Sequence, residues 1–182
     1  MFLVGKLYPH LEEAEQPGYQ GPCLSTEAKM AIIDRFYTKN QNIPLCIDHR
    51  NAGATGHVKT EDRMGRVCDL FLNKDKELMM TCEVSKQNRE GYKEVGQGLF
   101  RRNGAPQWGV SVGLMNVRGK ESNKLSYNLT HVALTPDPAF ASHGSYLTHY
   151  DLEPQRLNKI LLRDYPDAYF PPPLKAKLLE GV

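Results

Sequence analysis

Two stretches of the sequence decide the fold: QWGVSVGLMN at residues 107–116 and LSYNLTHVALT at residues 125–135. Each is rich in β-branched and apolar residues, and the polar segment 118–124 lies between them. This pattern predicts two long antiparallel strands joined as a hairpin centred on residue 121. In the first strand, the residues expected to face the core are Trp108, Val110, Val112 and Leu114.

The opposite face of the first strand carries a serine between two glycines. Gly109, Ser111 and Gly113 share this face, which leaves the hydroxyl without neighbouring side chains. A serine nucleophile needs such an approach, because the carbonyl that it attacks must come within about 3–3.5 Å. The alternative is an ordinary face of small residues packed under a helix.

The second predicted strand supplies a base for this serine. In a hairpin centred on residue 121, position 111 pairs with His131. Directly opposite residues have Cβ atoms about 4.5–5.5 Å apart, so the imidazole is expected within reach of the hydroxyl. A base also needs an orienting partner. The sequence alone leaves five candidates: Asp48, His49, His57, Asp137 and His143.

The remaining pattern predicts one strand-rich domain with peripheral helices, closed as a barrel or a sandwich. Further strands are expected over 43–47, 55–60, 65–72 and 77–84, and residues 1–24 are expected to be irregular. Helices are expected over about 26–38 with Ser25 as N-cap, over about 86–102, and from about 151 to 163. A last short helix should follow the prolines at 171–173.

Composition excludes several classes of function. The chain has 182 residues, with Lys+Arg 23 against Asp+Glu 21, and no segment concentrates the basic residues into a stripe. A nucleic-acid or membrane-surface protein would usually show such a stripe, so neither partner is expected. No apolar run approaches the roughly 18 residues of a membrane span. The short apolar start is not a signal-peptide core, so an intracellular compartment is expected.

The cysteines and histidines do not indicate a metal or a thiol enzyme. The four cysteines are far apart, without zinc-ligand spacing, and reduced thiols are expected. Cys46 and Cys82 alternate with apolar residues, which favours buried inert thiols over catalytic ones. Asp48, His49 and His57 lack a further ligand cluster. We therefore expect no metal and no cofactor.

Three short motifs together resemble the herpesvirus maturational protease (assemblin) family. The motifs are Ile47-Asp48-His49-Arg50 with Thr55-Gly56-His57-Val58, then Gly109-Val110-Ser111-Val112, and finally Thr130-His131-Val132-Ala133-Leu134. Their order is similar to the family's, with 62 residues from His49 to Ser111 and 20 from Ser111 to His131. The resemblance is anchored over residues 43–135, about half of the chain.

The resemblance implies a Ser-His-His triad on a particular fold. Ser111 would be the nucleophile, His131 the general base and His49 the third member, while His57 falls outside the triad. The family fold is a closed seven-stranded β-barrel surrounded by helices and active as a homodimer. It implies a single protease domain over 1–182, with the barrel core at about 1–150 and a helical segment at about 151–182 that is a possible dimer contact.

The chain departs from the family after His131. The family typically carries a Gly-Arg-Arg stretch there, which serves the oxyanion, whereas this chain has Thr135-Pro136-Asp137-Pro138-Ala139-Phe140. The backbone N–H of Ala139 is the expected oxyanion donor, since a main-chain donor needs no particular side chain. An arginine contribution would have to come from elsewhere, with Arg101, Arg102 and Arg118 as possible sources. The Pro-Ala stretch is more similar to the tailed-phage prohead proteases.

The resemblance implies a viral serine endopeptidase of capsid maturation. It would cleave the internal scaffold protein and its own precursor through an acyl-enzyme on Ser111. It would act inside the assembling procapsid, in the host nucleus if the chain is herpesviral. The alternatives are a phage-type prohead protease of the same fold and a non-catalytic scaffold-binding barrel.

Overall fold

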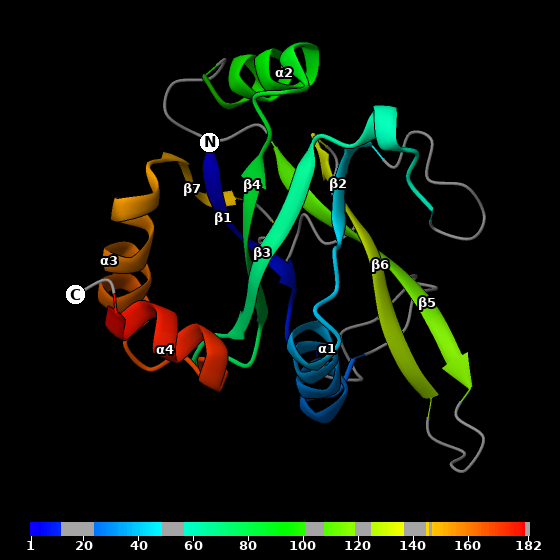
Figure 1. The fold of residues 1–182 in the computed structure, drawn as a ribbon. Coiled ribbons are helices and arrows are strands. Elements are labelled where there is room, and N and C mark those ends of the chain that lie inside the picture. Colours follow the sequence, from blue (N-terminus) through cyan, green and yellow to red (C-terminus); the bar gives the residue numbers. More distant parts are fainter. Residues whose placement is uncertain are drawn as a thin grey trace.

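A computed structural model shows one curled seven-stranded sheet with four α-helices around it (Figure 1). The structure describes residues 1–11, 24–48, 57–100, 108–118, 125–136, 145 and 147–180. The strand order across the sheet is β5-β6-β2-β3-β4-β1-β7. The strands are β1 (Phe2–Tyr8), β2 (Pro44–Ile47), β3 (Gly65–Leu72), β4 (Leu78–Val84), β5 (Gly109–Arg118), β6 (Leu125–Thr135) and β7 (Leu147–Leu152). All neighbouring strands pair antiparallel except β2 and β6, which are parallel.

The helices lie at three places around the sheet (Figure 1). They are α1 (Thr26–Thr38), α2 (Arg89–Phe100), α3 (Pro154–Asp164) and α4 (Pro172–Glu180), together with the short 3-10 helix η2 (Thr60–Asp62). The predicted cap of α1 is confirmed, because the Ser25 hydroxyl accepts a hydrogen bond from the Ala28 N–H. The predicted proline in the first turn of α3 is also confirmed, as Pro154.

The sheet separates two apolar clusters, one on each face. On the inner face, residues of all seven strands pack with Ile32, Ile33 and Phe36 of α1 into the main core. On the outer face, Val4, Phe71 and Met79 pack against α3 and α4. The helical residues in this second cluster are Leu157, Leu161, Leu174 and Leu178. Strands β1, β3 and β4 are therefore covered on both faces.

The expectation of a closed barrel is wrong. The sheet is an open half-barrel, with β5 and β7 as its two edge strands. Among the described residues, the edges approach each other where the Val110 N–H donates to Ser145 O at 2.9 Å and the Leu147 N–H donates to Trp108 O at 3.4 Å. These two hydrogen bonds connect one end of β5 to the start of β7.

Several predicted elements differ from the observed ones. Residues 1–24 were expected to be irregular, yet Phe2–Tyr8 form a central strand. No strand was expected over β7, and its last two residues, Asp151 and Leu152, were assigned to the start of a helix. Neither strand alternates regularly between apolar and polar residues, because β1 is buried on both faces and β7 is short. The strand expected over 55–60 is wrong in its described part, because Val58 forms a single bridge and η2 begins at Thr60.

The carboxylate of Asp69 ties the C-terminal helix to the sheet. Asp69 lies on β3 with its side chain only 4% exposed. Its Oδ2 accepts hydrogen bonds from the Thr81 hydroxyl at 2.9 Å and from Lys177 Nζ on α4 at 2.8 Å. The pKa of the nearby Tyr37 hydroxyl is raised, first by burial and then by the negative charge of Asp69. Lys177 is therefore the cation that balances a buried charge.

Replacing Lys177 with methionine tests this anchor. Methionine keeps the apolar stem and removes only the charge. Because half of the Lys177 side chain is exposed, we expect Lys177→Met to lower the free energy of unfolding by about 1–2 kcal/mol in urea titrations. Lys175→Met, at an exposed position of the same helix, is the control and should change it by less than about 0.5 kcal/mol. Equal effects of the two variants would contradict the anchor.

Candidate active site

Ser111 and His131 lie on adjacent strands and on the outer face of the sheet. Ser111 is in β5 and His131 is in β6, and both are almost buried, with 9% and 5% of their surfaces exposed. Their strand neighbours Val110, Val132 and Leu134 all belong to the inner core. Because side chains alternate across a strand, Ser111 and His131 point away from that core. The two predicted residues therefore share one face.

The register between them differs from the predicted one. Ser111 pairs with Ala133, and His131 pairs with Gly113, so the expected pairing of Ser111 with His131 is wrong. The difference is two residues along β6, which keeps both side chains on the same face. The pair is thus a diagonal one, with Cβ atoms typically about 7–8 Å apart, a separation that long side chains still cross.

The strand β6 contains a β-bulge directly before His131. Gly113 pairs with His131, but Leu114 pairs with Leu129, so Thr130 is an extra residue without a partner on β5. The burial pattern agrees, because Leu129 and Val132 both belong to the main core although three positions separate them. A bulge of this kind re-aims a side chain and increases the local twist. Here it changes the direction of Thr130.

The bulge brings the Thr130 hydroxyl to the imidazole of His131. Thr130 Oγ1 donates to the carbonyl oxygen of Gly113 at 3.0 Å. The same Oγ1 lies 3.0 Å from His131 Nδ1. In a regular strand, residues 130 and 131 would point to opposite faces, and this contact would not form. Thr130 therefore connects the imidazole to the backbone of β5.

The ring of His131 rests on the bare backbone of Gly113. A Cβ atom at position 113 would lie 2.1 Å from Cε1 and 2.2 Å from Nδ1 of the imidazole, far inside van der Waals contact. The ring thus occupies the space that any other residue would fill. The sequence assigned this glycine to an open approach for substrate. In the structure, the imidazole of His131 occupies this space instead.

The helix α1 holds β6 on the other side of the bulge. The guanidinium of Arg35 donates from Nη1 to the backbone oxygen of Tyr127 at 3.0 Å and to the side-chain oxygen of Asn128. These bonds fix the strand two to three residues before Thr130. The backbone on both sides of the bulge is therefore anchored, by α1 and by the β5 ladder.

The strand β2 borders the pair on the far side of β6. Cys46 is fully buried and pairs with Ala133, and Val58 packs with both of them in a small apolar cluster. Asp48 ends the strand, where its N–H donates to Leu134 O at 3.1 Å and its φ is 49°. A left-handed φ at a non-glycine residue marks a turn in the chain. The last residues of β2 thus include the buried Cys46, and the polar Asp48 follows directly after the strand.

Several predicted site residues lie outside the described residues. These are His49, the proposed third triad member, Ala139, the expected oxyanion donor, and the candidates Asp137, His143, Arg101 and Arg102. Of the remaining candidates, His57 is exposed. Only the backbone of Arg118 is described, at the end of β5. The described part of the site consists of Ser111, His131 and the residues that surround them.

Within the described ranges, there is little support for a metal site or a cysteine nucleophile. No group of three or more His, Cys, Asp or Glu side chains there is placed to hold a metal ion. Burial raises the pKa of the Cys68 thiol to about 11 and that of the Cys82 thiol still further, so neither is a ready nucleophile. No described helix is long and apolar enough to cross a membrane.

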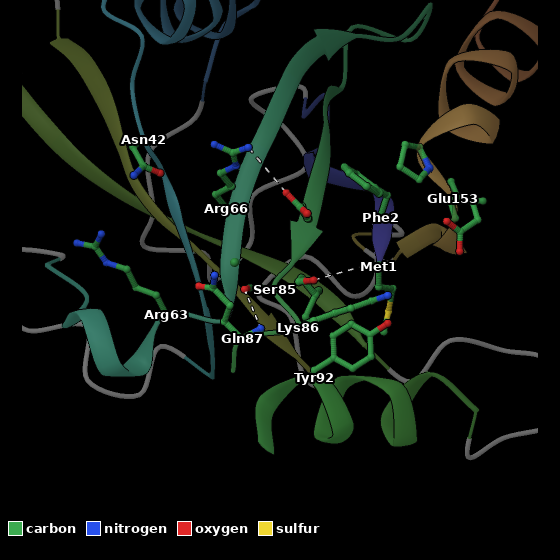
Figure 2. Close-up of a pocket in the computed structure, with 15 residues that line it drawn as sticks. Met1, Phe2, Asn42, Arg63, Arg66, Ser85, Lys86, Gln87, Tyr92 and Glu153 are labelled. Atoms are coloured by element: carbon green, nitrogen blue, oxygen red, sulfur yellow. Dashed lines mark hydrogen bonds and ion pairs between the residues drawn. The ribbon is translucent and has the colours of Figure 1, made fainter. Parts of the chain in front are cut away.

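A cleft of about 690 Å³ opens elsewhere, between the ends of β3 and β4, the start of α2 and the N-terminal residue (Figure 2). Its charged lining is mixed, since Arg63, Arg66 and Lys86 face Glu83 and Glu153. The guanidinium of Arg66 is 3.8 Å from the Glu83 carboxylate. Ser85 is the serine of this cleft, and its hydroxyl accepts a hydrogen bond from the Gln87 N–H (Figure 2). No described histidine lines the cleft.

Sequence reasoning missed Thr130. Strict alternation places residue 130 on the face opposite to His131, so the pattern assigns it no part in the site. The signal that was available is the spacing of Leu129 and Val132, two apolar residues at an odd separation within one strand. Such spacing indicates an extra residue in the strand.

Comparisons with known proteins find a likeness in structure and none in sequence. No family model matches the sequence, and no curated protein matches it. Among solved structures, the chain is similar to the Kaposi's sarcoma-associated herpesvirus protease, crystallised at room temperature in complex with an allosteric inhibitor. The sequences are 13% identical and the TM-score is 0.46, with 99% of this chain and 88% of that chain covered.

A methyl group added at position 113 should displace the imidazole of His131. We expect Gly113→Ala to lower the free energy of unfolding by about 1–3 kcal/mol, because the Cβ and the imidazole overlap. Gly96→Ala is the control, since a Cβ there meets nothing within 4 Å, and helix propensity predicts a gain of about 0.5–1 kcal/mol. Urea titrations measure both, and His131 ring signals in NMR spectra should move only in Gly113→Ala. Unchanged ring signals would contradict the contact.

Proposed function

We propose that this protein is a serine endopeptidase that uses Ser111 as nucleophile and His131 as general base. The observation that carries the proposal is the seating of the His131 ring on Gly113, on the same face as Ser111 and two residues from it along β5. The proposal is further supported by the three motifs that resemble the assemblin family.

The proposed reaction is peptide hydrolysis through an acyl-enzyme. The Ser111 oxygen bonds to the carbonyl carbon while its proton passes to His131, and the carbonyl electrons move to the oxygen. When this intermediate collapses, the C–N bond breaks and His131 returns the proton to the leaving amine. Water then attacks the ester, again with His131 as base, and releases Ser111. The low exposure of both groups strengthens the electrostatic interaction between them.

The remaining roles are carried over from the resemblance. We propose His49 as the third triad member, which stabilises the imidazolium of His131, and the backbone N–H of Ala139 as an oxyanion donor. An imidazole stabilises a neighbouring cation less than a carboxylate does, so slow turnover is expected. Turnover of that kind suits a reaction that each assembling particle needs only once.

We propose a viral assembly role for this activity. The substrates would be an internal scaffold protein and the chain's own precursor, cleaved inside the assembling procapsid by a homodimer. The apolar stripe of α3 is already buried, with Leu157 and Leu161 in the outer cluster. A dimer contact through α3 would therefore use its outward face, where Leu162 is exposed. A phage-type prohead protease is the alternative within the same class.

Labelling with a fluorophosphonate tests the proposal. Such reagents react much faster with an activated serine than with other side chains, so intact-mass spectrometry should show one adduct on the wild-type protein, mapped to Ser111. Ser111→Ala should remove it. Ser85→Ala is the matched control, since Ser85 lines the other cleft, and it should be labelled like the wild type. High protein concentration and a kosmotropic salt favour the proposed dimer.

The outcomes separate the candidate functions. No adduct under these conditions would contradict the triad and favour the non-catalytic scaffold-binding barrel. An adduct that is lost in Ser85→Ala but retained in Ser111→Ala would move the active site to the cleft of Figure 2. Cleavage of a co-expressed scaffold precursor by the wild type, but not by Ser111→Ala, would extend the proposal from an activated serine to the substrate.

A further inference from the structure

We propose that Thr130 is the positioning residue that fixes the tautomer of His131, so that Nδ1 carries the proton and Nε2 is the basic nitrogen. This inference rests on the proposed function for its catalytic meaning. Its structural content, a single tautomer held by one hydroxyl, stands on the hydrogen bonds of the bulge alone.

The direction of the Thr130 bonds follows from a count of protons. A threonine hydroxyl has one proton to donate. The Gly113 carbonyl oxygen is only an acceptor, and Thr130 Oγ1 donates to it at 3.0 Å. At its second contact, also 3.0 Å long, Oγ1 must therefore accept. The donor in that contact is His131 Nδ1, which consequently carries a proton.

This arrangement leaves Nε2 with the lone pair in the neutral ring. In the proposed reaction, Nε2 takes the proton of Ser111 as the oxygen–carbon bond forms. The ring then carries protons on both nitrogens, and the Thr130 oxygen still accepts from Nδ1. When the C–N bond breaks, the proton on Nε2 passes to the leaving amine. Thr130 stays in place throughout and gains or loses no proton.

The contacts around the ring disfavour the opposite tautomer. The ring lies against Gly113, where an added Cβ would be within 2.8 Å of three ring atoms. If Nε2 carried the proton, Nδ1 would face the lone pairs of Thr130 Oγ1, unless the hydroxyl gave up its bond to Gly113 O. Because this bond is partly buried, loss of the Thr130 donor would cost free energy at the Gly113 carbonyl. The bulge thus favours one tautomer through two coupled bonds.

Thr130 directly precedes His131 on β6, so one strand supplies both groups of this contact. In the proposed triad, Thr130 sets the tautomer of His131, and His49 stabilises the charge of the imidazolium.

Two variants of Thr130 test the inference. Thr130→Val keeps the shape and removes the hydroxyl, whereas Thr130→Ser keeps the hydroxyl and removes only a methyl group. We expect Thr130→Val to slow fluorophosphonate labelling of Ser111 by about tenfold or more, with Thr130→Ser within about threefold of the wild type. Equal thermal stability of the variants would exclude a folding defect as the cause.

The tautomer itself is measured by ¹⁵N NMR of the imidazole nitrogens, above the pH at which the ring titrates. The chain has six histidines, and His131→Gln identifies the signals of His131. We expect the wild type and Thr130→Ser to show a protonated Nδ1 and a basic Nε2. In Thr130→Val, the ring should shift to a mixture of tautomers or to protonated Nε2.

The two proposals fail in different ways. If the wild type is not labelled but its His131 is held as the Nδ1–H tautomer, the proposed protease activity is overturned and the positioning bond is confirmed. If the wild type is labelled and Thr130→Val matches it in both rate and tautomer, the inference is overturned and the protease stands. A tautomer change in His49→Ala, but not in Thr130→Val, would assign the role to residue 49.

Discussion

The single extra residue at Thr130 is the constraint on which the site depends. Without this bulge, period-two alternation would place Leu129 and His131 on the same face of β6. Either the leucine would leave the core or the imidazole would enter it. With the bulge, Leu129 belongs to the main core, and His131 faces outward over Gly113. One inserted residue thus allows Leu129 to pack in the core while His131 lies in the candidate active site.

The rest of the structure holds this bulge from several sides. Arg35 of α1 bonds the backbone before it, and the β5 ladder fixes the backbone after it. The ladder in turn belongs to an edge strand, because the sheet is an open half-barrel with β5 at one edge. In the described part of the chain, Ser111 therefore lies on a strand whose ladder is with β6, next to the hydrogen bonds of Trp108 and Val110 with Leu147 and Ser145.

The sequence predicted the elements that carry strong local signals. The Ser25 cap and apolar stripe of α1, and the alternation of β4, were sufficient for their boundaries to within one residue. The strands β1 and β7 were missed. Burial on both faces removes alternation from β1, and the end of β7 directly precedes the start of α3. Barrel closure depends on contacts between residues far apart in sequence, which local patterns do not encode. His49 and Ala139 stay predictions, since both lie outside the described residues.

The pairing of Ser111 with His131 shows which part of a strand argument is robust. The predicted register was wrong by two residues, yet the two side chains still share a face, because an even shift preserves it. An odd shift would have separated them. The sequence could not supply the distance between Ser111 and His131, because that distance depends on the register. It could not supply the bulge either, because the bulge depends on the packing of Leu129 in the core. For the same reason Gly113 was assigned to an open approach for substrate, although its missing side chain makes room for the imidazole of His131. Alternation predicts which residues share one face of a sheet, whereas tertiary packing determines how close together they lie.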